Sequence, residues 1–570
     1  MSSHQSTAGR PAHPVLIVGA GPVGSTLALE LARHGVPALL VEQHAAPSLH
    51  PKMDFVNGRS MELLRRLNVT EEIRERGVPA DCTFNFQWYR SLDEPPVSEW
   101  IAPSVSDTFK GIADHNDGTS PLEPHQRLPG NALEELLRAK ADGHPLVELR
   151  AGTAFRSLVQ EADAVRATLT DMTTGEEYTV RARYVVGCDG ANSAVRRSAG
   201  VPVRVTGPET DHCDVYFRSS DPRLRPYGRY FLAIAAGGAT LVSRDEQDTW
   251  TAFFPVLEDT DFDRDPIGVL SRRLGTDITA DEILKVTRWR GRMAVAERYR
   301  AGSVFLAGDA AHEFYPMGGH GANTGLADAV DLGWKLAAVL GGWGGPGLLD
   351  SYESERRPVA LFNREMCFNL LEVWRRFPQL VADGASPGHL AGFLAQEKYQ
   401  IHNSGIHFGY HYGDSPVVVH EERPDGIPVR PAARTSPAHE PNDTDAPLWS
   451  WSGIVPTTRP GSRAPSVFLA DGSPLLDLLA EGFTLVDFSG AARGRGVLEA
   501  AARRSVPVRH VRVNDPLARR VWGRDLVLVR PDQHVAWRGD APPADWGTVL
   551  DAVRGHRPTA PATGTSPTPR

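Results

Sequence analysis

The stretch HPVLIVGAGPVG (13–24) decides the fold of this chain. Its continuous apolar run is typical of a buried parallel strand, and an Ala- and Leu-rich helical pattern follows over residues 22–34. Gly19, Gly21 and Gly24 form a G-x-G-x-x-G motif between the two, with Pro22 at the first helical position. The first glycine permits a tight turn, the second lets a pyrophosphate approach the backbone, and the third lets the helix pack closely on the strand. The stretch therefore predicts a Rossmann-like unit whose helix N-terminus receives phosphate.

A carboxylate ends the next predicted strand, PALLVEQ (37–43). Glu42 stands 18 residues beyond Gly24, where it can accept hydrogen bonds from the hydroxyl groups of a ribose. Its charge would repel a 2′-phosphate. The nucleotide in this site is therefore predicted to be FAD or NAD rather than NADP.

Length and composition describe an ordinary globular chain. Its 570 residues suggest about three domains, and 41% are hydrophobic. A net charge of −9 gives no electrostatic reason to expect nucleic acid or an anionic membrane as a partner. No apolar run is long enough for a membrane span or a signal peptide, so we predict a cytoplasmic protein. The four cysteines are scattered, which disfavours a disulfide framework, a zinc site and a dithiol centre; they are Cys82, Cys188, Cys213 and Cys367.

Two further segments carry a family resemblance. YVVGCDGANSAVRR (184–197) and GSVFLAGDAAHEFYPMGGHGANTGLADAVDLGWKLAAVL (302–340) resemble, in order and spacing, the second and third fingerprints of single-component flavoprotein aromatic hydroxylases. The resemblance covers about residues 13–400. It implies FAD as the cofactor and NADPH or NADH as a transient co-substrate, since no second nucleotide fold is visible.

The third segment also has a physical interpretation. A strand ends at Gly308 and Asp309, and the family residue that matches Asp309 binds the ribityl–pyrophosphate part of FAD. Downstream, the loop of Pro316, Gly319 and Gly321 carries almost no side chains, so it can lie flat against a flavin ring. The helix that starts near Ala322 would offer positive potential to the reduced flavin.

The resemblance assigns further residues to the cofactor. Asp189 and Gly190 match a segment that serves both FAD and NAD(P)H, and Arg196 on the next helical turn could hold a pyrophosphate. Arg59 and Arg127 match arginines that contact FAD. The predicted cofactor-binding set is Gly19, Gly21, Pro22, Gly24, Glu42, Lys52, Arg59, Arg127, Asp189, Gly190, Arg196, Gly308, Asp309, Pro316, Gly319, Gly321, Ala322 and Asn323.

Four positions depart from the family pattern. Lys52 stands where many members have Arg, Gly130 where Gln is common, and His320 and Ala322 where Gln and Met are frequent. Pro316 and His320 lie near the expected position of the flavin ring, but no catalytic residue can be named from the sequence. His320 has either a direct role or a packing role against a loop carbonyl.

Three histidines near residue 407 do not predict a metal site. His402, His407 and His411 have a partly helical spacing, but no cysteine is near them, and aromatic packing explains them better than a metal. No metal site is predicted.

The last part of the chain, about 464–556, alternates strands and helices. It resembles the thioredoxin-like C-terminal domain of one branch of these hydroxylases, including LVRPDQHVAWR (528–538). It contains no cysteine, which excludes thiol redox chemistry and leaves a structural or oligomer-supporting role.

The predicted fold is α/β: a Rossmann-like FAD-binding domain, an inserted and mostly antiparallel β-sheet for the substrate, and a thioredoxin-like α/β domain. The predicted boundaries are 1–12 disordered tail, 13–205 and 291–419 FAD-binding domain, 206–290 inserted sheet, 420–463 linker, 464–556 C-terminal domain and 557–570 disordered tail. Alternating aromatic segments such as CDVYFRSS and TWTAFFPV indicate the inserted sheet.

The resemblance implies an FAD-dependent, NAD(P)H-consuming monooxygenase that uses O₂ to hydroxylate a phenolic or other electron-rich aromatic substrate through a C4a-hydroperoxyflavin. Only six of the 61 basic residues are Lys, which hints at a GC-rich source and favours bacterial natural-product biosynthesis on a small aromatic or polyketide-like substrate. Alternatives remain open: a Baeyer–Villiger or quinone-forming oxygenase, a phenol-degrading or antibiotic-inactivating hydroxylase, and a non-catalytic flavin-binding protein.

Overall fold

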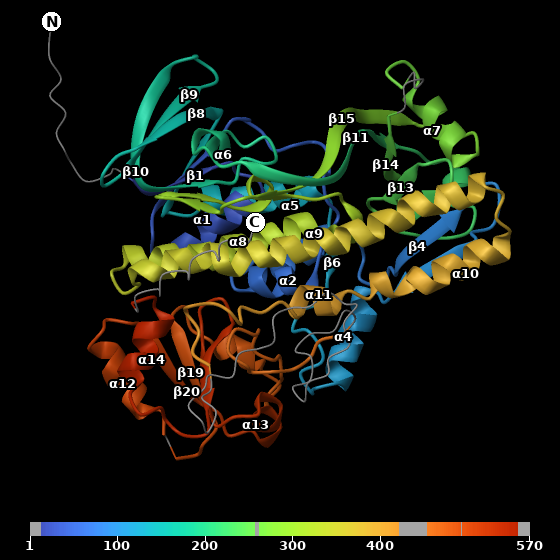
Figure 1. Cartoon of the computed structure of the whole chain (residues 1–570). Helices are drawn as coiled ribbons and strands as arrows, with labels where there is room; N and C mark the ends of the chain where they lie inside the picture. The colour runs from blue at the N-terminus through green and yellow to red at the C-terminus, as the bar shows by residue number, and fades with distance from the viewer. Residues whose placement is uncertain (1–12, 257–261, 421–452, 492, 557–570) are drawn as a thin grey trace, which may run out of the picture.

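The computed structural model describes residues 13–256, 262–420, 453–491 and 493–556. Figure 1 shows two sheets side by side in its upper part and a smaller C-terminal domain below them. The long helix α9 (Pro346–Ala382) runs beneath both sheets, with α8 (His320–Leu340) alongside it. The predicted α/β class and its two sheet types are confirmed. The predicted tails, 1–12 and 557–570, lie outside the described residues.

The first sheet carries the glycine-rich turn at the end of its central strand. Its strands are β1 (His13–Val18), β2 (Ala38–Glu42), β7 (Val147–Ala151), β8 (Thr153–Gln160), β9 (Val165–Asp171), β10 (Glu177–Gly187), β16 (Arg300–Ala301) and β17 (Val304–Leu306). The order β17-β10-β1-β2-β7 is parallel throughout, and β8 and β9 add an antiparallel hairpin to β10. Val15, Leu16 and Ile17 are fully buried, as expected for a strand covered on both faces. Helix α1 (Pro22–Arg33) covers part of this sheet and packs against α8 and α5 (Gly130–Asp142).

The second sheet is wider than the sequence predicts. Its strands are β4 (Phe84–Tyr89), β5 (Ser98–Ala102), β11 (Val203–Arg218), β12 (Leu232–Ala235), β13 (Thr240–Ser243), β14 (Thr249–Pro255), β15 (Glu282–Ala296) and β18 (His312–Glu313). Their order is β18-β15-β11-β14-β13-β12-β4-β5, antiparallel except for the parallel pair β12–β4. The sheet is therefore not confined to residues 206–290, because β4 and β5 join it from a segment about 140 residues away. Nothing local in the sequence encodes that pairing.

The two faces of the second sheet have different neighbours. The outer face packs on α7 (Pro266–Leu274) through Cys213, Val215 and Phe217. The inner face packs on α9 and α10 (Pro387–Glu397) through side chains such as Phe86 and Trp88.

Short elements connect these layers. They are β3 (Phe55–Val56), α2 (Gly58–Arg65), α3 (Thr70–Arg76), α4 (Val105–Asp114), β6 (Gln126–Arg127), α6 (Ala194–Ser198), η1 (Pro222–Leu224), η2 (Gly308–Ala310), η3 (Met317–Gly319), η4 (Lys398–Ile401), α11 (Ser404–Phe408) and η5 (Leu475–Leu478).

The C-terminal domain has a thioredoxin-like arrangement. Its elements are β19 (Phe483–Asp487), α12 (Arg495–Ala502), β20 (Val508–Arg512), α13 (Pro516–Trp522), β21 (Leu526–Val529), β22 (Val535–Gly539) and α14 (Trp546–Val553). The sheet order is β20-β19-β21-β22, and only β19 and β20 are parallel. Most of the predicted linker, 421–452, lies outside the described residues. Its last residues pack on this domain, where the Gly461 N–H donates to the Val535 carbonyl at 2.7 Å, so we propose an earlier domain start than residue 464.

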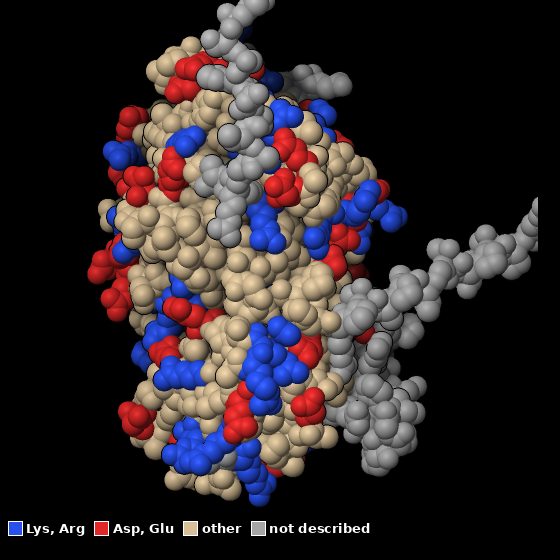
Figure 2. Space-filling view, turned by 90° about the vertical axis from the view of Figure 1, so that its left-hand side faces the viewer, with Lys and Arg blue, Asp and Glu red and all other residues tan. Residues whose placement is uncertain are grey.

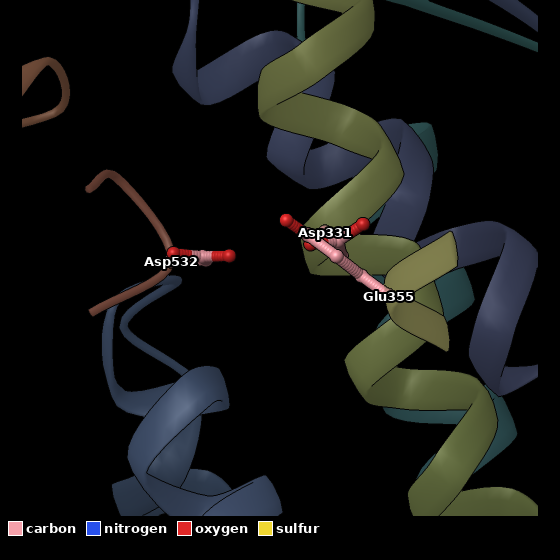
Figure 3. Close-up of side chains that lie close together, drawn as sticks. All are labelled: Asp331, Glu355 and Asp532. Carbon is pink, nitrogen blue, oxygen red and sulfur yellow. The ribbon is translucent and has the colours of Figure 1, made fainter. Parts of the chain in front are cut away.

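A buried ion cluster joins the C-terminal domain to the rest of the chain. Figure 3 shows the carboxylates of Asp331 on α8, Glu355 on α9 and Asp532 in the loop between β21 and β22, and these three groups lie close together. Arg530 donates to both oxygens of Glu355 at 2.7 and 2.8 Å and to Asp331 at 3.1 Å. Lys335 donates to Asp331 at 2.7 Å and to Glu355 at 2.5 Å.

This carboxylate trio has a metal-like arrangement, but two side-chain cations, Arg530 and Lys335, already contact its oxygens. Burial alone would raise the pKa of Glu355, whereas Arg530 and Lys335 lower it to about 2. All of these side chains are almost fully buried, so each charge depends on its partners. The cluster is therefore an interdomain contact.

Charge on the surface is mixed. Figure 2 shows acidic and basic side chains interspersed on the face that it presents. None of the helices in the described part of the chain combines the length and apolarity that crossing a membrane requires.

Replacing Arg530 with Met should destabilise the protein by about 3–5 kcal/mol, because three buried carboxylates lose the guanidinium that donates to all of them. The measurement is the free energy of unfolding from denaturant titration, with Arg509→Met, an exposed arginine of the same domain, as the control. The control should change stability by less than about 0.5 kcal/mol. Equal stability of the two variants would contradict the importance of the cluster.

Candidate functional site

The first glycine turn has the geometry that the motif predicts. Gly19 has a φ of +103°, and its N–H donates to the Val41 carbonyl at 2.8 Å. A Cβ on Gly24 would lie 1.9 Å from the Gly19 carbonyl oxygen, so α1 presses directly on the turn. A Cβ on Gly21, by contrast, would meet no protein atom within 4 Å. The open side of the turn is thus at Gly21, where the motif places a pyrophosphate.

The N-terminus of α1 suits an anion. Gly21 is its N-cap and Pro22 its first residue, and neither a side-chain cap nor an acidic first-turn residue occupies the N–H groups. Glu42 stands beside the turn, where its carboxylate accepts from the N–H groups of Ala20 and His44, each at 2.9 Å. A carboxylate has about four lone-pair sites, so Glu42 can still accept from a ribose.

The segment 184–197 contacts the segment 302–340 and fixes its backbone. Asp189 accepts from the N–H groups of Ala194 at 2.6 Å and Val195 at 3.0 Å, so it caps α6. Arg196 donates to the carbonyls of Ala310 and Ala191, both at 3.0 Å. Arg196 therefore fixes the backbone beside Asp309, and the pyrophosphate contact that the sequence suggests for it stays a prediction. Gly190 has a φ of +77° and an open Cβ position.

Asp309 lies at the end of β17. Gly308 before it has a φ of +60°, and a Cβ there would lie 2.9 Å from Val23 of α1. Asp309 is exposed, but the protein around its carboxylate displaces water, and this desolvation raises its pKa. The charges of His312 and of the exposed Lys52 lower that pKa. A carboxylate in this position can accept hydrogen bonds from the ribityl hydroxyls of FAD.

Buried residues that no motif identified support this strand end. Asp328 of α8 accepts from the Gly308 N–H at 3.2 Å, from His312 at 2.8 Å and from Arg356 at 2.7 Å. All of these side chains are buried. The only signal was their position inside or just after the third fingerprint.

The glycine loop leads into α8 without a side-chain cap. Pro316 is exposed, and Gly319 has a φ of +66° with Phe55 2.9 Å from its Cβ position. Asn323 fixes the first turn, since it accepts from the Asn57 N–H at 2.9 Å and donates to the Phe55 carbonyl at 2.9 Å. The remaining predicted positions, Gly321 and Ala322, are partly exposed in the first turn of α8. This uncapped N-terminus fits the flavin edge that becomes negative on reduction.

His320 has a packing position. It is buried, a Cβ on Gly318 would lie 2.6 Å from its Nε2, and burial lowers its pKa to about 4. Its ring meets that of His407 edge-on at 5.7 Å, beside a cavity of about 20 Å³. Of the other two predicted packing histidines, His402 is exposed and His411 half-buried. A role of His320 in the reaction is not favoured by this geometry.

Two arginines predicted to contact FAD have other partners. Arg59 donates to Gln533 at 2.5 Å and to the Asp532 carbonyl at 2.9 Å, so it holds the C-terminal domain. Arg127 donates to Glu246 and to the Ser243 carbonyl, each at 2.5 Å, and its guanidinium stacks on Phe231. Arg59 also donates to Glu62 at 3.1 Å, while its Nε has no hydrogen-bond partner among the described residues. The contacts with Gln533 and Glu246 could not be predicted from the sequence because these partners lie more than 100 residues away, and contact of either arginine with FAD stays a prediction.

Steric crowding explains why position 130 is a glycine. A Cβ there would lie 2.6 Å from Met53 Cγ and 2.9 Å from the Met53 nitrogen. The Gln that is common at this position would therefore collide with the segment before β3.

Aromatic side chains line the inner face of the second sheet next to the glycine loop. Tyr315 and Met317, which flank Pro316, belong to the same apolar cluster. The aromatic members that remain only partly buried are Phe84, Phe253, Trp289, Phe314, Phe368, Trp374 and Phe393. Such rings offer a flat apolar surface beside the predicted flavin position.

The chain is similar to known flavoproteins over almost its whole length. Residues 12–363 match the family described as FAD binding domain, and residues 457–556 match aromatic-ring hydroxylase, C-terminal. The FAD-dependent monooxygenase apdD of Emericella nidulans is 33% identical over 92% of this chain and 87% of its own length. Aklavinone 12-hydroxylase RdmE of Streptomyces purpurascens is 32% identical over 95% of this chain and 97% of its own. The structure of the rebeccamycin biosynthetic enzyme RebC with reduced flavin has a TM-score of 0.80 and 33% identity, and the match covers 96% of this chain and 99% of that chain.

Asp309→Ala should yield protein largely without FAD, because the ribityl chain loses charge-assisted hydrogen bonds worth roughly 1.5–3 kcal/mol each. The ratio of flavin to protein absorbance after purification measures the loss. Asp142→Ala, which changes an exposed carboxylate at the end of α5, is the control and should retain FAD. Full flavin content in the Asp309 variant would contradict the predicted role.

Gly21→Ala and Gly24→Ala should separate binding from folding. The methyl group at position 21 meets open space, so the apoprotein should keep its thermal midpoint while its FAD affinity falls at least about tenfold. The methyl group at position 24 meets a backbone oxygen, so this variant should lose roughly 1–3 kcal/mol or more of stability. Calorimetry of the apoproteins and FAD titration distinguish the two, and a destabilised Gly21 variant with normal FAD affinity would overturn the assignment.

Proposed function

Because the chain belongs to the FAD-dependent aromatic-ring hydroxylase family, as an FAD-dependent monooxygenase, we propose that it hydroxylates a phenolic or other electron-rich aromatic substrate. The observation that carries this proposal is the partly buried aromatic surface on the inner face of the second sheet. That surface shares one apolar cluster with Tyr315 and Met317 of the glycine loop. A flat aromatic substrate placed there would lie beside the cofactor.

The cofactor-binding residues are proposed in three groups. Gly19, Gly21, Gly24 and the N-terminus of α1 would receive the pyrophosphate, and Glu42 the ribose. Asp309 would hold the ribityl chain. The loop from Pro316 through Gly319 and Gly321, with Ala322 and the backbone-fixing Asn323, would support the flavin ring.

When bound, FAD supplies the electron transfer and the activation of O₂, with NADPH or NADH proposed as the electron donor. The chain contributes binding, orientation and the exclusion of water. Its aromatic residues would position the substrate ring, and the apolar surroundings would keep bulk water from the reacting atoms.

A bacterial natural-product pathway is the proposed setting. RdmE, named as an aklavinone hydroxylase, supports a polyketide-like substrate, and the low Lys content supports a GC-rich source. The fungal relative apdD shows that the similarity extends beyond bacteria.

The test is NAD(P)H oxidation by the FAD-loaded enzyme against phenol, resorcinol, 4-hydroxy-2-pyridone, 1-naphthol and a hydroxyanthraquinone. At least one compound should accelerate oxidation of NADPH or NADH about tenfold or more and give a product with one added oxygen atom on a ring carbon. Mass spectrometry and NMR identify the product, and the Asp309→Ala protein without FAD is the blank. A ring-inserted oxygen would instead indicate Baeyer–Villiger chemistry, and no oxygenated product from any compound would contradict the proposal.

A further inference from the structure

A histidine–carboxylate pair faces the inner side of the second sheet. His50 lies in the segment before β3, and its Nε2 is 2.8 Å from Asp214 Oδ2 of β11. The other oxygen of Asp214 accepts from the indole N–H of Trp289 on β15 at 2.7 Å. Because a carboxylate only accepts, the hydrogen of the neutral imidazole is on Nε2. Nδ1 therefore carries the lone pair.

That lone pair has no partner in the described part of the chain. His50 is 5% exposed, and no described residue hydrogen-bonds to its Nδ1. A buried polar atom without a partner costs free energy, which a bound hydroxyl group would recover. The pair is thus an incomplete hydrogen-bond chain that ends in a proton acceptor.

The segment that carries His50 connects the substrate sheet with the cofactor residues. Lys52, two residues later, interacts electrostatically with Asp309, and Phe55 lies against Gly319 of the glycine loop. On the other side Arg244, after β13, donates to the Pro51 carbonyl at 3.1 Å. His50 therefore lies where the inner face of the sheet meets the predicted flavin site.

We propose that His50 is the base that takes the phenolic proton of the substrate, and that Asp214 is the positioning residue that holds its ring. The proposal rests on the proposed function, since only a phenolic substrate offers this proton. In the step the substrate O–H bond breaks, its electron pair stays on the phenolate oxygen, and the proton moves to Nδ1, directly or through one water. No oxidant or reductant takes part. The resulting imidazolium is stabilised by Asp214 through the Nε2–H bond.

The surrounding charges favour this direction of transfer. Arg244 is paired with Asp54 at 3.2 Å, so it does not oppose a proton on His50. Tyr216, whose ring meets His50 edge-on, stays neutral because burial raises its pKa. Glu134 of α5 accepts a hydrogen bond from the Ser48 N–H at 3.3 Å, and Lys52 is exposed. Asp214 is the carboxylate that contacts the imidazole.

A second histidine, on the strand β11 that carries Asp214, has no carboxylate partner. His212 stacks on Trp289 at 4.4 Å, and neither of its ring nitrogens has a partner in the described chain. Burial lowers its pKa to about 4, so it remains neutral near pH 7. It serves as the matched control, because it differs from His50 in lacking a carboxylate in hydrogen-bond contact.

The test compares His50→Gln, Asp214→Asn and His212→Gln with the wild type as full-length, FAD-loaded enzymes. The substrate is the most active phenol from the panel above. His50→Gln should lower kcat at pH 7 by roughly 10²- to 10⁴-fold with unchanged FAD content. The kcat of this variant should recover as the pH approaches the value at which the free phenol ionises. Asp214→Asn should lower kcat less and move the acidic limb of the pH profile to lower pH, because the protonated ring loses its carboxylate. His212→Gln should keep the wild-type limb.

A second readout needs no turnover. 4-Nitrocatechol, whose anion is strongly coloured, is titrated with pH on the oxidised holoenzyme. It should ionise at least one pH unit lower on the wild type than in free solution, and His50→Gln should abolish that shift while His212→Gln retains it. A shift that persists in the His50 variant, or a kcat loss that is equal at every pH, would overturn the assignment of His50. A wild type that makes no product from any phenol is a failure of the proposed function, and the nitrocatechol titration still judges His50 separately.

Discussion

The close approach of two helices to the carboxyl edge of the first sheet is the constraint on which the rest of the structure depends. A Cβ on Gly24 would lie 1.9 Å from the Gly19 oxygen, and a Cβ on Gly325 of α8 would lie 2.9 Å from the Cα of Gly308. Val23 of α1 fills the space between these helices and the strand end. Because side chains larger than hydrogen are excluded at these points, both helices begin close to the same edge. Their uncapped N-termini then offer positive potential at the positions proposed for the phosphates and for the flavin.

The sequence predicted these local features well because each of them is a local conformational demand. The left-handed φ values of Gly19, Gly308 and Gly319 follow from turns that are fully encoded within a few residues. The buried strand over 13–18 follows in the same way from its own apolar run. For the same reason the fingerprints indicated the right family, since they consist of such turns.

The sequence could not predict contacts between distant segments. Arg59 donates to Gln533, 474 residues away, and Arg127 donates to Glu246, 119 residues away, and neither contact follows from the motifs. The parallel pairing of β4 with β12 was missed for the same reason. An arginine at a given position in a motif shows that a cation is needed there. Which anion it meets is decided by tertiary structure.

The polar face of α8 binds the C-terminal domain, which contains no cysteine. Thr324, Asp328, Asp331 and Lys335 follow one another at spacings of four, three and four residues, so they lie on one face of the helix. The first turns of that face contact Arg356 and the Gly308 N–H, which fix the strand end beside Asp309. The later turns bind Arg530 of the C-terminal domain. A buried helix face with this much charge is stable only when every group has its partner. The C-terminal domain supplies the cation Arg530 to this face, and the glycine loop precedes the N-terminus of the same helix. Electrostatic pairing thus connects the C-terminal domain to the helix that follows this loop.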